Sequence, residues 1–424
     1  PVRLAYLGLL AVPVWLTRSP RSRAAVITAF VAGTTVAAFE AIYQMFGQVS
    51  FRPDGNLGNA NLLGALIAMA IPLAASRGLR GGTLSPFWWA AIVVLAGGLY
   101  ASTSRSGAVG ALAGCAVLAV LALRGRAAVA AAVAGAGVVG AALAAIVLTP
   151  LRELNGDPGP ARIHLWHDAV AFIAARPLTG WGEDTTGLAL GRYLTANWSP
   201  GVTFDRLHSC PLDLAATQGL VGVAALSWVL WTFARGTWRQ RRSEGVAALV
   251  AACAGYTAWV LFNFDWAPAT GAFWLLAGTA WASATAGGAP AEGADAPQSE
   301  MRSSGWRSVL AVGLALVAVG LAVLPVLADA WYYAGRSDLS VAVSPLQARY
   351  HWARGDELVA RGSTAAGVAE LQRAADLGET EPTLYVDLGD RLQSLGRTAD
   401  AIRAYRRALE IDPYYDPAIQ RLAA

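Results

Sequence analysis

The chain has 424 residues, of which 55% are hydrophobic and only 14% are charged. Soluble domains carry about 25% charged residues, so this composition excludes an ordinary soluble protein and predicts an integral membrane protein. All 32 basic residues are arginines. They lie in short clusters between apolar runs without interleaved aromatic residues, which argues against nucleic acid as a partner.

The three cysteines, Cys115, Cys210 and Cys253, are scattered along the chain and show no CxxC spacing. We therefore expect no disulfide framework and no structural zinc. The sequence starts at Pro1, directly in an apolar run, which we interpret as the loss of one or more N-terminal helices.

Apolar runs of membrane-spanning length recur along the chain. Because a helix needs about 20 apolar residues to cross a bilayer, these runs predict about ten spans. The predicted fold class is all-α, a polytopic bundle of membrane helices in which residues 1–286 form the main domain. The expected spans are 2–16, 24–46, 58–75, 87–103, 106–123, 127–149, 210–234, 244–262, 268–286 and 307–327.

Arginines cluster in alternate connections between these spans. The positive-inside rule places such connections in the cytoplasm, so the other connections, among them the long polar loop 150–208, are predicted to be extracytoplasmic. The clustered residues are Arg18, Arg21, Arg23, Arg77, Arg80, Arg124, Arg126, Arg235, Arg239, Arg241, Arg242, Arg302 and Arg307.

Two regions of different composition follow the membrane domain. Residues 287–306 are rich in Ala, Gly, Pro and Ser and predict a flexible cytoplasmic linker, after which the final span at 307–327 returns the chain to the outside. From residue 351 on, the composition is that of a soluble helical protein, and motifs in the region 331–424 recur with a period of about 34 residues. We predict a short extracytoplasmic tetratricopeptide-repeat region, a kind of module that binds a protein partner.

Four polar features fall on the predicted outer side. They are Asn59 with Asn61, then Arg105, then Arg162 and Trp166 followed by Gly180 and Gly182, and finally His208 with Ser209. Each has a structural alternative: asparagine can cap a helix, Arg105 can snorkel to head groups, Arg162 can pair with Asp157 or Asp168, and His208 can be an interfacial histidine. His164 and His167 lack a set of carboxylate partners, so no metal site is predicted.

The order of these motifs resembles the O-antigen ligase and polymerase superfamily. The motifs are Gly58 to Asn61, Ser104 to Gly107, Arg162 to Trp166, Pro177 to Gly182 and His208 to Gly222. The resemblance extends from about residue 24 to residue 286, and C-terminal tetratricopeptide repeats also resemble members of this group. It implies a GT-C-like glycosyltransferase in the bacterial cytoplasmic (inner) membrane, with its active site on the extracytoplasmic face.

The resemblance also implies a reaction and roles for individual residues. An oligosaccharide would pass from undecaprenyl diphosphate to an acceptor glycan, lipid or protein, with inversion and without a metal or cofactor. Arg105 and Arg162 would contact the diphosphate, and His208 would take the proton of the acceptor hydroxyl. Residues assigned to substrate binding are Asn59, Asn61, Trp166, Gly180, Gly182 and Ser209.

The chemistry of these side chains fits that assignment. Planar guanidinium groups bind phosphate oxygens bidentately and stabilise the charge of a diphosphate leaving group. A histidine that titrates near neutrality can accept a hydroxyl proton in the same step. Relatives carry asparagine where this chain has Ser209, so the orientation of His208 is the point of departure from the family pattern.

Other functions stay open. A polysaccharide polymerase or a protein O-oligosaccharyltransferase of the same superfamily would differ only in its acceptor. A non-enzymatic scaffold or transporter would recruit envelope proteins through the repeats. A transporter would show charged or broken helices at the bilayer midplane, whereas the predicted spans are nearly free of charge apart from Glu40, which favours the enzyme.

Overall fold

The computed structural model describes residues 2–17, 19–48, 50, 52–148, 159–198, 200, 202–286, 324 and 327–424. Helices are the regular elements found in these ranges, which confirms the predicted all-α fold class. The contacts between residues divide the chain into two units. The membrane unit comprises Pro1–Gly182 and Arg206–Glu292, and the repeat unit comprises Glu183–Asp205 and Gly293–Ala424.

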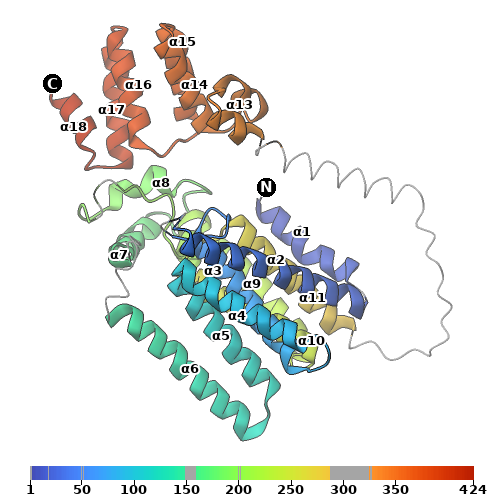
Figure 1. Cartoon of the computed structure of the whole chain (residues 1–424). Coiled ribbons are helices and arrows are strands. Elements are labelled where there is room, and N and C mark those ends of the chain that lie inside the picture. Colours follow the sequence, from blue (N-terminus) through green and yellow to red (C-terminus); the bar gives the residue numbers. More distant parts are fainter. Residues whose placement is uncertain are drawn as a thin grey trace. The chain divides into compact units, whose positions relative to one another are not determined.

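The membrane unit is a bundle of long apolar helices (Figure 1). Helix α3 lies inside this bundle, where it packs against α2, α4, α5 and α10 and buries most of its residues. The helices of the unit are α1 (Val2–Leu16), α2 (Pro20–Phe46), α3 (Ala60–Leu79), α4 (Ser85–Ser102), α5 (Arg105–Ala122), α6 (Gly125–Leu148), α7 (Gly159–Ala175), α9 (Cys210–Trp238), α10 (Glu244–Val260) and α11 (Ala267–Ala286).

Six helices in the described ranges, α2 to α6 and α9, are long and apolar enough to cross a membrane. Helix α1 has 15 residues and α10 has 17, which is short of the roughly 20 that a bilayer core requires. The expected number of about ten spans is therefore not confirmed. The predicted linker 287–306 and nearly all of the predicted span 307–327 lie outside the described residues.

The interval 150–208, expected as a polar loop, contains helical segments in its described part. Helix α7 begins it, and the short elements α8 (Thr186–Ala189) and η2 (Leu190–Tyr193) follow. By their contacts α7 belongs to the membrane unit, whereas α8 and η2 belong to the repeat unit. The interval therefore connects the two units twice, before residue 183 and after residue 205.

The repeat unit contains the predicted helix hairpins. Its further helices are α13 (Ser337–Val343), α14 (Ala348–Ala360), α15 (Thr364–Asp376), α16 (Pro382–Ser394), α17 (Thr398–Ile411) and α18 (Asp416–Ala423). Helices α14 and α15 form one hairpin, and α16 and α17 form the next. Gly355 faces Leu371 in the first hairpin, and Gly389 faces Tyr405 at the equivalent place in the second. The two hairpins are thus structural repeats.

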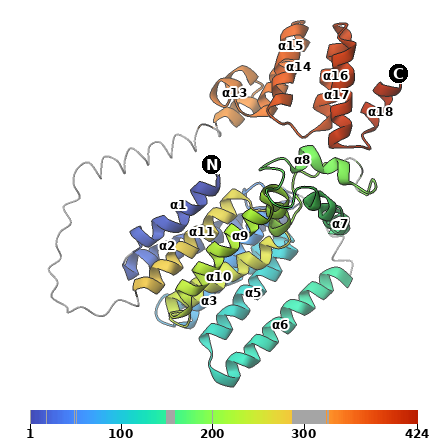
Figure 2. The ribbon, with the colours of Figure 1, turned by 180° about the vertical axis from the view of Figure 1, so that it is seen from behind.

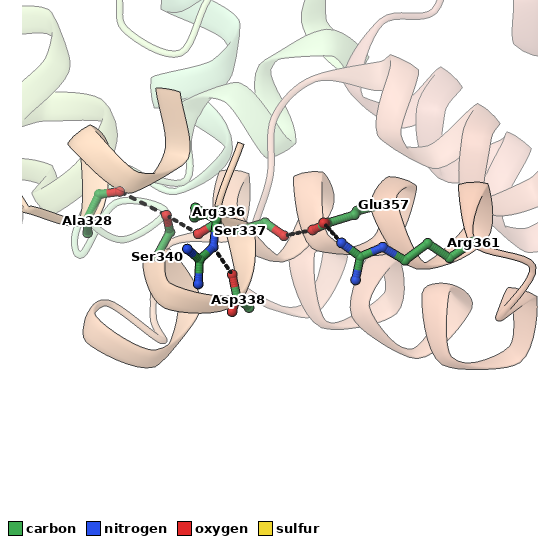
Figure 3. A network of polar contacts seen from close by, with 7 residues as sticks. All are labelled: Ala328, Arg336, Ser337, Asp338, Ser340, Glu357 and Arg361. Carbon is green, nitrogen blue, oxygen red and sulfur yellow. Dashed lines mark hydrogen bonds and ion pairs between the residues drawn. The ribbon is translucent and has the colours of Figure 1, made fainter. Parts of the chain in front are cut away.

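Polar contacts attach α13 to the first hairpin (Figure 3). The hydroxyl of Ser340 donates to the carbonyl of Ala328 over 2.9 Å, and the hydroxyl of Ser337 donates to the carboxylate of Glu357 in α14. Arg361, one turn further along α14, forms an ion pair with the same carboxylate. These contacts fix the segment that precedes the repeats to their first helix.

Candidate functional site

The backbone of His208 has an unusual conformation. Its φ angle is +50°, in the left-handed region that residues other than glycine rarely adopt. Such a conformation costs about 1–3 kcal/mol and persists only where the surrounding structure holds it. His208 directly precedes Ser209, the N-cap residue of α9. The left-handed conformation of His208 is held by hydrogen bonds of the residues next to it in the chain.

The buried carboxylate of Asp213 holds the residue before His208. Its Oδ1 accepts a hydrogen bond from the N–H of Leu207 over 2.7 Å, while the N–H of Asp213 donates to the carbonyl of Ser209 over 2.8 Å. Asp213 is 5% exposed, and it lies in the first turn of α9, where a negative charge is favourable. The first turn of α9 thus bends the chain at His208.

Helix α7 fixes the same segment from another direction. The indole N–H of Trp166 donates to the carbonyl of Leu207 over 2.8 Å. The Nη1 of Arg162, one turn earlier in α7, donates to the carbonyl of Phe262 over 3.1 Å, and the rings of Trp166 and Phe262 are 6.3 Å apart. Both predicted α7 residues therefore link α7 to the backbone near His208. Of the alternative partners considered for Arg162, Asp157 lies outside the described residues, and Asp168 contacts His167.

The turn between α10 and α11 completes the surroundings of His208. The carbonyl of Asn263 accepts a hydrogen bond from the N–H of Cys210 over 2.8 Å. The ring of Phe264 meets the imidazole of His208 edge to face, with a centroid distance of 5.3 Å, and also contacts Trp266. These residues fall between the predicted spans 244–262 and 268–286, so Asn263, Phe264 and Trp266 are site residues that the sequence motifs did not identify.

Residues from separate segments of the chain line a small pocket of about 40 Å³. It contains three of the predicted residues, Asn59, Asn61 and His208, although they come from distant parts of the sequence. A volume of this size accommodates a water molecule or a hydroxyl group but excludes a sugar ring. The lining residues are Asn59, Asn61, His208, Trp259, Asn263, Phe264 and Trp266.

The two asparagines have defined hydrogen bonds at this pocket. The side-chain oxygen of Asn59 caps α3 by accepting from the N–H of Asn61 over 2.8 Å, as the structural alternative predicts. The side-chain oxygen of Asn61 accepts from Arg52 Nη2 over 2.9 Å and from the hydroxyl of Ser104 over 3.2 Å. Asn61 thus connects the segment before α3 with the start of α5.

Arg105 lies close to this network along the chain. It is the first residue of α5 and follows Ser104, whose hydroxyl caps the helix by accepting from the N–H of Gly107. The side chain of Arg105 is half-buried. Arg105 and Arg162, the two predicted phosphate-binding residues, are not among the residues that line the pocket. Each is connected to it through a neighbour, because Ser104 bonds to Asn61 and Arg162 bonds to Phe262, which precedes Asn263.

Gly180 and Gly182 contact the backbone of α9 at a kink. Helix α9 is interrupted at Gly219, where φ is +63° and ψ is −165°. The N–H groups of Trp181 and Gly182 donate to the carbonyls of Ala216 and Thr217 over 2.8 and 2.9 Å. A Cβ atom on Gly180 would lie 2.4 Å from the carbonyl carbon of Thr217. The two glycines therefore allow the loop to satisfy the carbonyls that the kink exposes.

Other candidates lie away from the pocket. His164 and His167 are exposed on α7, and in the part of the chain that the structure describes there is no group of three or more His, Cys, Asp or Glu residues suited to a metal ion. Arg192, another arginine of the interval 150–208, forms an ion pair with Glu410 of the repeats over 3.0 Å. Ser209, in contrast, directly follows the pocket residue His208 and is buried as the N-cap residue of α9.

The fold and the site define a multi-pass helical membrane protein with a histidine pocket at the start of α9 and a tetratricopeptide region. Residues 90–227 match the sequence profile of the O-antigen ligase family, and residues 382–424 match the profile of the tetratricopeptide repeat. The predicted resemblance is thereby confirmed over these ranges. The ligase match includes Arg105, Arg162, Trp166, Gly180, Gly182, His208 and Ser209.

Asn59 and Asn61 precede the matched range, so their place in the site rests on the pocket. No curated protein gives a significant match to the chain. The ligase match supports a membrane glycosyltransferase of the O-antigen ligase type.

Proposed function

We propose that the protein transfers an oligosaccharide from undecaprenyl diphosphate to an acceptor hydroxyl on the extracytoplasmic face of the cytoplasmic membrane. The observation that carries this proposal is the imidazole of His208, held in a left-handed backbone conformation at a pocket shared with Asn59 and Asn61. Strained residues of this kind are concentrated at active sites, where the surrounding structure maintains them.

His208 is proposed as the general base. A nitrogen of the neutral imidazole accepts the acceptor's hydroxyl proton while the acceptor oxygen attacks the anomeric carbon. The bond from that carbon to the diphosphate oxygen breaks at the same time, and its electron pair leaves with the diphosphate. Attack from the face opposite the leaving group inverts the anomeric carbon. The pocket admits the reacting hydroxyl, and the sugar rings of donor and acceptor lie outside it.

Arg105 and Arg162 are proposed to bind the leaving diphosphate. A guanidinium group is permanently charged and planar, so it can stabilise the negative charge that develops on the phosphate oxygens. The bond from Arg162 to the carbonyl of Phe262 fixes the direction of its guanidinium. Arg105 is attached to the start of α5 beside the hydrogen bond between Ser104 and Asn61. With two cationic groups in these roles, the transfer needs no divalent metal.

Trp166, Gly180 and Gly182 are predicted to bind substrate. Their contacts also support a second role, which is to position His208. Trp166 holds the carbonyl of Leu207, and the two glycines hold the kink of α9. All three therefore act on α9 or on Leu207, the residue that directly precedes His208. Their effect on transfer would then come through the position of His208.

Transfer from a purified donor tests the proposal. The protein in nanodiscs would be given undecaprenyl-diphosphate oligosaccharide, a lipid, glycan or peptide acceptor, and a chelator. We expect chelator-resistant transfer to one acceptor class, which would also separate the ligase, polymerase and protein-glycosylating alternatives. Absence of transfer from every polyprenyl-linked donor, with the protein folded, would contradict the proposal and favour a scaffold.

A further inference from the structure

The segment 183–205, which lies between the motifs of the ligase family, is folded against the repeats. By its contacts it belongs to the repeat unit, although the residues on both sides of it belong to the membrane unit. Figures 1 and 2 show α8 next to the C-terminal helices, and both α8 and η2 contact α17. The face of α17 that meets them is therefore occupied by the protein's own chain.

Segment 183–205 packs closely against the repeats at Gly191. A Cβ atom on Gly191 would lie 2.2 Å from the carbonyl oxygen of Ile411, at the end of α17. Gly187, one turn earlier, would meet the methyl group of Thr380 at 2.8 Å. Since both neighbours belong to the repeats, any side chain at Gly191 would push the segment away from α17.

Apolar and charged contacts extend this interface. Leu188 packs against the buried core of the repeats. Leu190, Leu194 and Phe204 enclose with Ile411 a space of only about 20 Å³, too small to hold more than one water molecule. At the rim, Arg192 and Glu410 form an ion pair over 3.0 Å. The segment thus has an apolar centre and a charged edge, which is the general composition of a specific protein interface.

The segment leads directly into the site. Asp205, its last residue, is followed by Arg206, Leu207 and His208 in the sequence. At its other end Glu183 follows Gly182, which is bonded to α9. A segment released from α17 would add a long mobile connection immediately before His208.

We propose that the tetratricopeptide repeats bind residues 183–205 of their own chain and thereby position the chain that carries His208. The partner of this face of α17 is an internal peptide, recognised through Leu188, Leu190, Gly191 and Arg192. The binding part of this inference stands on the contacts alone, and the positioning part rests on the function proposed above.

Hydrogen exchange of the full chain in nanodiscs tests the binding without substrate. Gly191→Ala places a methyl group against a backbone oxygen, so we expect the protection of amides 186–194 to fall about tenfold or more. Gly245→Ala is the matched control, because a Cβ atom there meets nothing within 4 Å. Unchanged protection in Gly191→Ala would overturn the binding proposal.

A change of charge gives a second test that does not depend on packing. Arg192→Glu places a carboxylate beside Glu410 and should raise exchange about twofold to fivefold, since half-exposed ion pairs are weak. Adding Glu410→Gln removes that like-charge repulsion without placing a cation beside Arg407, the other partner of Glu410, and should restore part of the protection. Arg403→Glu, a reversal at an exposed repeat residue that pairs with Asp400, should leave the segment protected. No change in Arg192→Glu, or no restoration by the double variant, would contradict the interface.

Oligosaccharide transfer by the same variants tests whether the bound segment positions His208. We expect Gly191→Ala to lower kcat at least fivefold, whereas Gly245→Ala keeps it. Increased exchange with unchanged kcat would overturn the positioning and leave binding supported. If the wild type transfers nothing, the proposed function fails, and the exchange comparison still decides whether the repeats bind the segment.

Discussion

Replacement of Trp166 by phenylalanine tests how the position of His208 is fixed. The change keeps an aromatic ring beside Phe262 but removes the N–H that donates to the carbonyl of Leu207 over 2.8 Å. Leu207 is fully buried, so its carbonyl loses a partner that water replaces poorly. A buried group left without its hydrogen bond costs about 1–3 kcal/mol.

If that cost falls on the conformation of His208, it corresponds to about a fivefold to 150-fold loss of kcat. The Michaelis constant should change little, because the substrates are not contacted by the indole N–H. The assay is steady-state transfer with purified Trp166→Phe in nanodiscs, accompanied by thermal unfolding to establish that the variant is folded.

Trp181→Phe is the matched control. The indole N–H of Trp181 donates to the carbonyl of Phe172 over 2.9 Å, which is the same kind of bond at a place that does not touch Leu207. We expect this control to retain most of its kcat. Equal losses in both variants, or wild-type kcat in Trp166→Phe, would refute the reasoning that the bond to Leu207 positions His208.

Three further changes follow from individual contacts. Gly180→Ala should lower the free energy of unfolding by about 1–3 kcal/mol, since its φ is +69° and its Cβ would meet Thr217; thermal unfolding measures this, and a Tm equal to that of the wild type would contradict the close packing. Asp213→Ala should reduce kcat more than Asp213→Asn, which keeps an acceptor for the N–H of Leu207; equal kcat values for both variants would exclude that role. Burial opposes the ionisation of Glu410, but hydrogen bonds from Arg407 and Arg192 outweigh it and lower its pKa below the ordinary value of 4.5. Its stabilising contribution is therefore present above pH 4.5 and is lost as the pH falls through the lowered pKa, so Glu410→Gln should reduce Tm at pH 7 and converge with the wild type in acid; a constant difference at all pH values would be inconsistent with this.

Parts of the fold follow from local sequence patterns. The long helices arise from continuous apolar runs, and the hairpins of the repeats follow from glycines that recur opposite large side chains such as Leu371 and Tyr405. The number of spans does not follow from the apolar runs alone, because the apolar helices α1 and α10 fall short of the length that a bilayer requires.

The site was predictable where polar residues interrupt apolar runs. His208, Asn59 and Asn61 were identified in this way, and they line one pocket. Asn263 and Phe264 were missed because their contribution is a backbone carbonyl and a ring edge, which leave no motif in the sequence. The turn between α10 and α11 reaches the start of α9 through tertiary packing, which no local sequence pattern predicts.

The role of Trp166 also lay beyond the sequence. The sequence motif predicts a role for Trp166 in substrate binding, and the structure adds a bond from its N–H to the carbonyl of Leu207. The same holds for Arg192, whose ion pair joins segments far apart in the chain. Long-range hydrogen bonds of this kind depend on tertiary packing and cannot be read from spacing.

The central claim is that His208 is the base of a glycosyl transfer. The most direct measurement compares single-turnover transfer from undecaprenyl-diphosphate oligosaccharide by the wild type, His208→Ala and His164→Ala, an exposed histidine of α7 that serves as control. We expect a loss of about 100-fold to 10,000-fold in His208→Ala, within the range that general base catalysis contributes, and near wild-type transfer in His164→Ala. Transfer by folded His208→Ala at the wild-type rate would contradict this claim.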